Sequence, residues 1–135
     1  MHVNLQAPTV LHAVKGISLS AIEANIRYKN RTDLVLIKIT KGGTAAGVFT
    51  LNKFCAAPVV LCRQHLAKTK SPRYLLINAG NANAGTGKKG FETAKQCCVN
   101  LAKIDNIKPE EVLPFSTGVI GEQLPLSPFV KHLPN

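Results

Sequence analysis

Two glycine-rich segments hold the residues whose types and spacing could do chemistry. The first, Asn78–Gly87, reads NAGNANAGTG, and the second, Ser116–Gly121, reads STGVIG. Each follows an apolar run typical of a buried strand, so each is expected to begin where a strand ends. Small residues in such loops leave backbone N–H groups accessible to a ligand or to a developing negative charge. The two segments therefore indicate a site built largely from backbone donors.

Thr117 and Gly118 are the candidate site residues of the second segment. Thr117 offers a hydroxyl and an N–H, and Gly118 offers an N–H that no side chain covers. Two donors that converge on one point can stabilise a carbonyl oxygen as it becomes an oxyanion. The pattern alone is more typical of the simpler alternative, a glycine-bearing strand exit without a ligand.

The first segment leaves two interpretations open, a phosphate cradle and a tight strand-to-helix loop without a ligand. Gly80 and Gly85 match the two glycines of the phosphate-binding loop G-x-x-x-x-G-K-[ST], but Thr86 stands where that motif has lysine. The segment does not match G-x-G-x-x-G either. Neither nucleotide-binding motif is therefore present in this loop.

The sequence supports no serine, cysteine or lysine nucleophile. Ser116 has no evident base, and His65 is expected on the exposed side of a helix. Four cysteines without a C-x-x-C pair are expected to be reduced, mostly buried thiols, and the histidines show no ligand spacing toward them, so no metal site is expected. These cysteines are Cys55, Cys62, Cys97 and Cys98, and the histidines are His2, His12, His65 and His132.

Composition limits the remaining classes of function. With 135 residues, 45% of them apolar, the chain is expected to form a single domain portion over residues 1–135. The formal net charge is +10, but the basic residues are scattered, aromatic residues make up 5%, and tryptophan is absent. A nucleic-acid partner is therefore the least favoured class, and an acidic protein partner is at least as compatible with the charge. No secretory signal or membrane-spanning stretch is recognisable, so we expect a cytoplasmic protein.

Periodicity predicts the elements that would position these segments. Strands are expected at the start of 17–27, over 34–40, 45–50 and 74–77, and over 112–116, with a hairpin at Gly42–Gly43 and with Pro114 favouring an edge strand. Helices are expected from Pro58, with a buried stripe of Val59, Cys62 and Leu66, and over 88–104, with a buried face of Phe91, Ala94, Cys98 and Leu101. A helical turn at 108–111 and the start of a helix at 127–133 complete the pattern. The order of strands and helices predicts a layered α/β or α+β fold.

Four stretches together resemble the ornithine acetyltransferase family, the bifunctional glutamate N-acetyltransferases of arginine biosynthesis. These stretches are Gly47–Thr50 with Asn52, Cys55–Val59, Leu75–Gly87 and Leu113–Glu122. The match extends over about residues 8–130, in order and without large gaps. It identifies the chain as the N-terminal part of the family's α chain, with the remainder of that chain and the β chain absent.

The resemblance implies a layered α/β fold related to self-processing aminopeptidases. It also implies a precursor that cleaves itself before an internal threonine, which becomes the N-terminal nucleophile of a β chain. Acetyl would pass from N-acetylornithine to that threonine and then to glutamate. Some members also accept acetyl-CoA as a substrate, and no cofactor is expected. Thr117 and Gly118 would form the oxyanion hole, in a hetero-oligomer of α and β chains.

Two alternatives to the acetyltransferase remain at this point. One is a self-processing aminopeptidase of the same fold, and the other is a truncated, non-catalytic fragment, since this chain contains neither the nucleophile nor the family's substrate-binding lysine and threonines. On either interpretation this chain alone is expected to be inactive.

Overall fold

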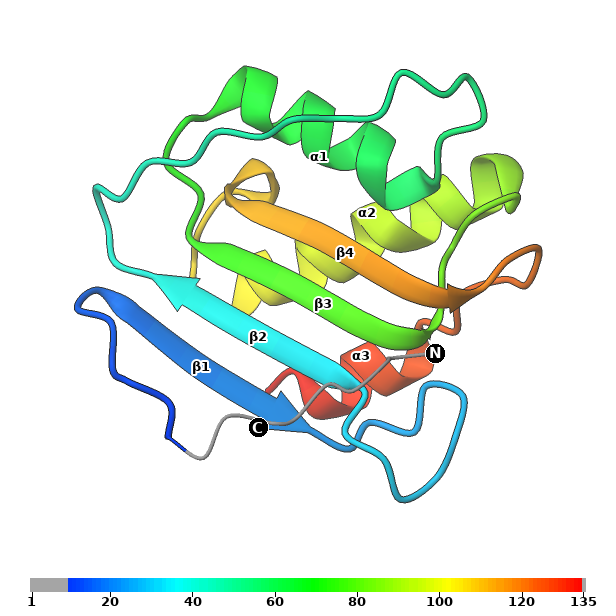
Figure 1. Cartoon of the computed structure of the whole chain (residues 1–135), viewed down its shortest axis with the longest axis horizontal. Helices are drawn as coiled ribbons and strands as arrows, with labels where there is room; N and C mark the ends of the chain where they lie inside the picture. Colours follow the sequence, from blue (N-terminus) through cyan, green and yellow to red (C-terminus); the bar gives the residue numbers. More distant parts are fainter. Residues whose placement is uncertain (1–9, 135) are drawn as a thin grey trace.

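The computed structural model describes residues 10–134. Four strands form one sheet, and helices pack along it (Figure 1). The strands are β1 (Ile17–Ile22), β2 (Leu34–Ile39), β3 (Tyr74–Asn81) and β4 (Val112–Val119); the helices are α1 (Ala57–Lys68), α2 (Gly87–Ile104), the 3₁₀ turn η1 (Pro109–Glu111) and α3 (Ser127–His132).

The sheet has the order β1-β2-β3-β4 and mixes two kinds of pairing. β1 with β2 and β2 with β3 are antiparallel, whereas β3 and β4 are parallel. A parallel neighbour requires a crossover connection, which α2 supplies here. The register of the parallel pair places Ala79 beside Thr117 and Gly80 beside Gly118. The two glycine-rich segments of the sequence therefore begin side by side.

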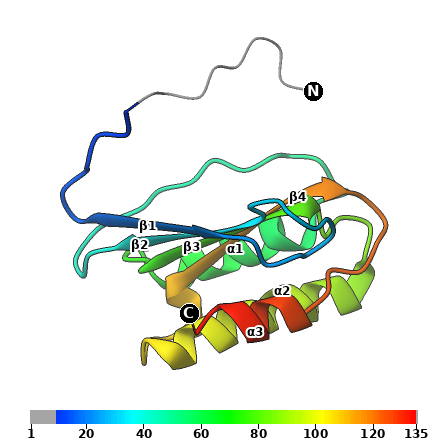
Figure 2. The same cartoon turned by 90° about the horizontal axis from the view of Figure 1, so that it is seen from below.

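The hydrophobic core lies between one face of the sheet and the helices. α2 and α3 lie against this face, and α1 contacts both β4 and α2 (Figures 1 and 2). Leu34, Leu76 and Val112 point toward the helices from three neighbouring strands and are almost completely buried. The α2 residues Ala94, Cys98 and Leu101 meet them, as the helical spacing predicts.

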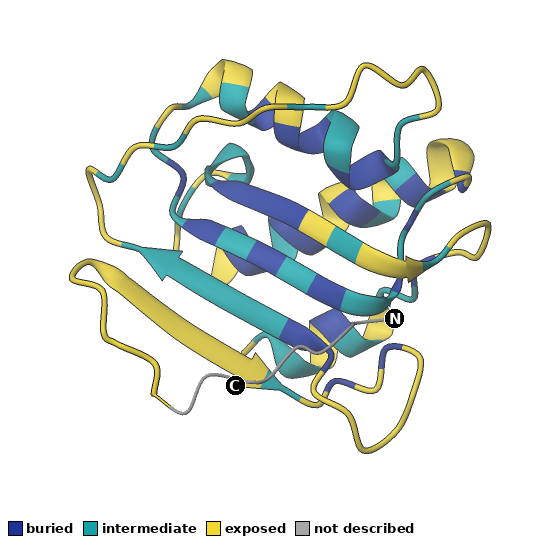
Figure 3. Cartoon of the chain, viewed as in Figure 1, coloured by how far each residue is buried: buried dark blue, intermediate teal, exposed yellow. Residues whose placement is uncertain are grey.

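The opposite face of the sheet is also apolar, but no helix of the described residues covers it (Figure 2). Alternation along the strands places Ile17 and Leu19 of β1, Ile37 of β2 and Phe115 of β4 on this face. Leu19 is 64% exposed and Phe115 is 42% exposed. Figure 3 shows a further difference between strands: the edge strand β1 is exposed along nearly its whole length, whereas much of β3 is buried. We refer to the surface formed by Ile17, Leu19, Ile37 and Phe115 as the open face.

The predicted strand at 45–50 is wrong. Residues 44–56, which precede α1 in the chain, run alongside it as an irregular segment. The N–H of Ala45 donates to the carbonyl of Lys70 at 3.0 Å, and the Arg63 guanidinium donates to the carbonyl of Thr50 at 3.0 Å. β2 already has β1 and β3 as its two neighbours, so a strand following the Gly42–Gly43 turn could not pair with it. The predicted hairpin fails for the same reason.

The predicted surface position of His65 is also wrong. The buried face of α1 consists of Ala57, Pro58, Leu61, Cys62 and His65, so only Cys62 of the expected stripe lies on it. His65 Nδ1 lies 2.7 Å from the carbonyl oxygen of Val112 and ties α1 to β4. Other predictions are confirmed: α2 agrees with the predicted helix within one residue, and Pro114 lies on β4, an edge strand of this sheet.

Candidate functional site

Thr117 and Gly118 lie inside β4, near its carboxyl end, and not in a loop after it. β3 likewise continues through Asn78–Asn81, four residues that the sequence assigned to a loop. Parallel pairing brings these ends to the same edge of the sheet, where ligands commonly bind in α/β proteins. Both Thr117 and Gly118 are exposed.

Gly118 and Gly80 permit an unusually close approach of three segments. Gly118 has φ +135° and Gly80 has φ +99°, conformations that L side chains rarely adopt. A Cβ on Gly118 would lie 2.3 Å from the carbonyl carbon of Gly80, and a Cβ on Gly80 would lie 2.9 Å from the Cβ of Arg27. The absence of both side chains lets β4 contact β3 and lets β3 contact the loop between β1 and β2.

A cavity of about 400 Å³ opens at this contact. Its lining comes from the β1–β2 loop and from the ends of β3 and β4, and consists of Tyr28, Arg31, Asp33, Ala79, Gly80, Thr117, Gly118 and Val119. Thr117 and Gly118 therefore line a concave surface, as an oxyanion site requires. Sequence analysis did not single out the residues that the β1–β2 loop contributes.

Asp33 holds that loop in place. Its carboxylate is buried and accepts hydrogen bonds from the N–H groups of Ala24 at 2.7 Å and Ile26 at 2.6 Å. A carboxylate satisfied by backbone donors is stable in a buried position and fixes the loop that carries them. Asp33 therefore supports one wall of the cavity. The signal in the sequence was a lone acid directly before a strongly apolar strand.

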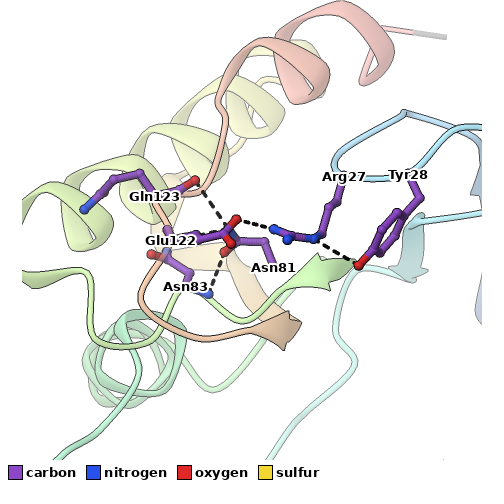
Figure 4. A network of polar contacts seen from close by, with 6 residues as sticks. All are labelled: Arg27, Tyr28, Asn81, Asn83, Glu122 and Gln123. Atoms are coloured by element: carbon purple, nitrogen blue, oxygen red, sulfur yellow. Dashed lines mark hydrogen bonds and ion pairs between the residues drawn. The ribbon is translucent and has the colours of Figure 1, made fainter.

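The asparagines of the first segment form a buried hydrogen-bond network. The amide nitrogen of Asn81 donates to the carbonyls of Glu122 and Gln123, and its amide oxygen accepts from the N–H of Asn83 at 2.8 Å (Figure 4). Asn83 has φ +46°, as expected for an asparagine in the left-handed region. The network connects the end of β3 to the segment that follows β4. The tight-loop interpretation is thus sufficient to explain Asn83.

An ion pair between Arg27 and Glu122 lies at the same edge of the sheet. The Arg27 guanidinium donates to the carboxylate of Glu122 and, through Nε, to the hydroxyl of Tyr28 at 3.1 Å (Figure 4). The hydrogen bond that Arg27 donates to Glu122, more than any other contact, raises the pKa of Arg27, which stays charged. Arg27, Tyr28 and Glu122 join the β1–β2 loop to the segment after β4.

Asn78 and Ser116 are paired one residue before Ala79 and Thr117, which line the cavity. Ser116 Oγ donates to Asn78 Oδ1 at 2.6 Å, and Asn78 Nδ2 donates to the carbonyl of Asn81 at 2.9 Å. Asn78 is 2% exposed. Its amide therefore bridges β4 and the end of β3.

The cysteines provide no reactive thiol in the site. All four are free; Cys62, Cys97 and Cys98 are buried, as predicted, and Cys55 is partly exposed. Burial raises the pKa of Cys62 and of Cys97 to about 12, which keeps both as thiols near neutral pH. Burial also lowers the pKa of His65, whose ring is already bonded to Val112.

Residues 10–134 hold neither a cluster of metal-binding side chains nor a helix that could span a membrane. No cluster of three or more His, Cys, Asp or Glu side chains within this range could bind a metal ion. No helix in the same range is long and apolar enough to cross a membrane.

Nearly the whole of this chain aligns with proteins of known sequence. The chain is 45% identical over 99% of its length to a Colwellia psychrerythraea protein and 48% identical over 98% of its length to a Psychrobacter arcticus protein. Both are named arginine biosynthesis bifunctional protein ArgJ. The chain covers 34% and 32% of their lengths, respectively. It therefore spans about a third of each of these relatives.

Solved structures agree with the fold. The arginine biosynthesis bifunctional protein ArgJ of Bacillus halodurans superposes with a TM-score of 0.83 at 34% identity, over 89% of this chain and 62% of that one. The ornithine acetyltransferase of Mycobacterium tuberculosis, solved with ornithine, superposes with a TM-score of 0.84 at 31% identity, over 89% and 65%. The layered α/β fold is thus that of the ArgJ structures. Since the ArgJ family model also matches residues 18–135, the chain belongs to the ArgJ family.

Proposed function

We propose that this chain supplies the oxyanion hole of an acetyltransferase that moves acetyl from N-acetylornithine to glutamate. The arginine-biosynthesis names of the relatives support the pathway. The observation that carries the proposal is that Thr117 and Gly118, both exposed, line one cavity at the joined ends of β3 and β4. The Thr117 hydroxyl and the Gly118 N–H are the two donors.

The backbone at Gly118 favours this role. Successive N–H groups of a regular strand point in opposite directions, so two neighbouring residues do not normally address one atom. Here only one of the two donors is an N–H: the other is the Thr117 hydroxyl, and Gly118, which has φ +135° and no side chain, leaves its own N–H uncovered. Small residues around them leave room for an acetyl group.

The reaction runs in two balanced halves. A threonine Oγ of the β chain attacks the acetyl carbonyl of N-acetylornithine and gives its proton to the threonine's own amine, which acts as base. The carbonyl oxygen becomes an oxyanion between Thr117 and Gly118, and ornithine leaves with the proton on its nitrogen. The neutral amine of glutamate then attacks the acetyl-threonine ester. The attacking nitrogen gives one proton to the threonine's amine, which passes it to the departing threonine oxygen, and N-acetylglutamate is released.

Several finer features belong to this proposal. The complete protein processes itself into α and β chains, which associate as a hetero-oligomer in the cytoplasm. It requires no cofactor; acetyl-CoA serves as a second acetyl donor where the family member accepts it. N-acetylornithine, glutamate and the β chain are then the partners of the site.

The test uses a chimera in which residues 18–135 of this chain replace the matching region of the Psychrobacter arcticus protein. Transfer of acetyl from N-acetylornithine to glutamate is measured by mass spectrometry. We expect activity in the chimera, and we expect Thr117→Ala to lower kcat by about 100-fold, because one donor to the oxyanion is lost. Thr44→Ala, an exposed loop threonine, is the matched control and should leave kcat unchanged.

Two outcomes would contradict the proposal. One is a folded, assembled chimera that transfers no acetyl between these substrates. The other is a Thr117→Ala variant with the turnover of the unsubstituted chimera. Size-exclusion chromatography and circular dichroism establish folding and assembly in both cases.

A further inference from the structure

We propose that Asn78 is a positioning residue for the Thr117–Gly118 pair and acts through the hydroxyl of Ser116. This inference rests on the proposed function, because it assigns to Asn78 the task of holding the two donors at the oxyanion position. No contact between Asn78 and substrate is implied.

The first observation is the hydrogen bond across the parallel pair. Asn78 and Ser116 are register partners, and Ser116 Oγ donates to Asn78 Oδ1 at 2.6 Å. Ser116 is covalently joined to Thr117, so this bond fixes the backbone immediately before the first donor. A side-chain bond between strands restrains the local geometry beyond what the backbone ladder provides.

The second observation is that the same amide also holds β3. Asn78 Nδ2 donates to the carbonyl of Asn81 at 2.9 Å, across the two residues that include Gly80. The backbones of Gly80 and Gly118 lie so close together that a Cβ on Gly118 would overlap backbone atoms of Gly80 and Asn81. One side chain therefore restrains the residue before Thr117 and also the backbone on which Gly118 rests.

The third observation is the burial of this amide in an otherwise apolar layer. Asn78 shares the helix-facing side of β3 with Tyr74 and Leu76, which are also buried. Burying an amide among such residues costs free energy unless each polar atom is bonded, and an apolar residue would fill the space without that requirement. Both polar atoms of Asn78 are bonded, one to each strand. This arrangement suits a residue that fixes geometry.

Two variants break the two halves of the arrangement separately. Ser116→Ala removes the donor on β4. Asn78→Asp keeps an acceptor for Ser116 but replaces the Nδ2 donor to Asn81 with a carboxylate oxygen. Ser116→Thr restores the hydroxyl, and Ser20→Ala, an exposed strand serine on β1, is the matched control.

In the chimera we expect Ser116→Ala and Asn78→Asp to lower kcat by about 10- to 100-fold, because a small misplacement of donors has effects of that order. KM for N-acetylornithine should stay within about twofold, because the donors act on the transition state and not on the bound substrate. Ser116→Thr should recover most of the lost kcat, and Ser20→Ala should have no effect. A loss of thermal stability with unchanged kcat would show a structural role only and would overturn the proposal.

A second measurement on the 135-residue chain does not depend on activity. The amide ¹H–¹⁵N shifts and heteronuclear NOE values of Thr117 and Gly118 are compared between the unsubstituted chain and Ser116→Ala. We expect both shifts to move and both NOE values to fall, because the segment is released on the ps–ns timescale. Unchanged shifts and NOE values would overturn the positioning role. If these values change while the unsubstituted chimera transfers no acetyl, the proposed reaction fails and the restraint on Thr117–Gly118 stands.

Discussion

At the scale of single residues, the site depends on side chains that are missing as much as on those present. Gly118 and Gly80 let two strands and a loop meet where any Cβ would collide with backbone or with Arg27. A glycine at such a point permits both the unusual φ and the close approach. The proposed donors and the cavity wall therefore share one steric requirement.

Gly118→Ala should destabilise the chain strongly. The added Cβ would lie 2.3 Å from the carbonyl carbon of Gly80, and the backbone would keep a φ of +135°. We expect the free energy of unfolding to fall by about 3 kcal/mol or more, since steric overlap adds to backbone strain. Urea denaturation followed by circular dichroism measures it.

Gly42→Ala is the control for this effect. Gly42 has φ +91°, but a Cβ there would meet no atom within 4 Å. The loss should be about 1 to 2 kcal/mol from backbone strain alone. Equal losses at the two positions would show that the contact between Gly80 and Gly118 is unimportant.

Some residues of this site are predictable from the sequence and others are not. Thr117 and Gly118 could be selected because their types suggest oxyanion donors, and the structure places both at the cavity. The pattern predicts a loop at Asn78, although Asn78 is a buried strand residue. Its role depends on Ser116, which lies 38 positions away. A partner so distant in sequence becomes visible only when the strand register is known.

At the scale of elements, α1 contributes more than apolar packing. Its buried face carries His65, whose Nδ1 bonds the carbonyl of Val112 at the start of β4. Cys62 donates from the same helix to the carbonyl of Pro114 at 3.0 Å. These two carbonyls belong to an edge strand, so α1 satisfies acceptors that another strand would otherwise meet.

The stability of the chain should decrease with falling pH because of His65. Burial lowers its pKa from the ordinary value of 6.5, and the bond to Val112 offsets this only in part. Below about pH 6.5 the unfolded chain therefore binds a proton more readily than the native chain, so the free energy of unfolding falls until the native pKa is passed. Thermal midpoints measured between pH 7.5 and pH 5 should show this decline.

His65→Asn should flatten the decline, because an asparagine at this position does not titrate but can still donate toward Val112. The exposed residue His12 provides the control His12→Asn, which should keep the slope of the original chain. A slope unchanged by His65→Asn would assign the pH dependence to other groups.

Elements with a strong local period were predictable, and those decided by pairing were not. The α2 face followed from the spacing of Ala94, Cys98 and Leu101. Residues 45–50 have the composition of a strand, yet no vacant edge lies beside β2. The stripe of Val59, Cys62 and Leu66 predicts the wrong buried side of α1, because apolar residues lie on more than one side of that helix and its buried face includes the polar His65.

At the scale of the whole molecule, the fold covers only one side of its sheet. The helices lie on one face, and the open face of Ile17, Leu19, Ile37 and Phe115 faces the other way (Figure 2). Contiguous exposed apolar surface of this kind is uncommon on a soluble domain. The layered class was predictable from the order of strands and helices. Which face of the sheet the helices cover was not predictable, because β2 and β3 carry apolar residues on both faces.

The open face should bind an apolar dye. Anilinonaphthalene sulfonate fluorescence should rise on addition of the 135-residue chain at neutral pH, and Leu19→Lys should lower that rise because it places a charge at the most exposed of these four positions. Val130→Lys on α3 is the control, since Val130 is 53% exposed but lies away from the open face. Equal reductions by the two variants would assign dye binding to scattered residues.

The parallel pairing of β3 and β4 also sets the order in which the cavity can form. β1, β2 and β3 are antiparallel neighbours and can assemble from the chain without α2, whereas β4 can add to β3 only after the whole α2 crossover has been traversed. Thr117 and Gly118 thus reach Ala79 and Gly80 only once the α2 crossover has returned the chain to β3. A newly synthesised chain therefore lacks this cavity until β4 has paired with β3, because Thr117, Gly118 and Val119 of β4 form part of its lining.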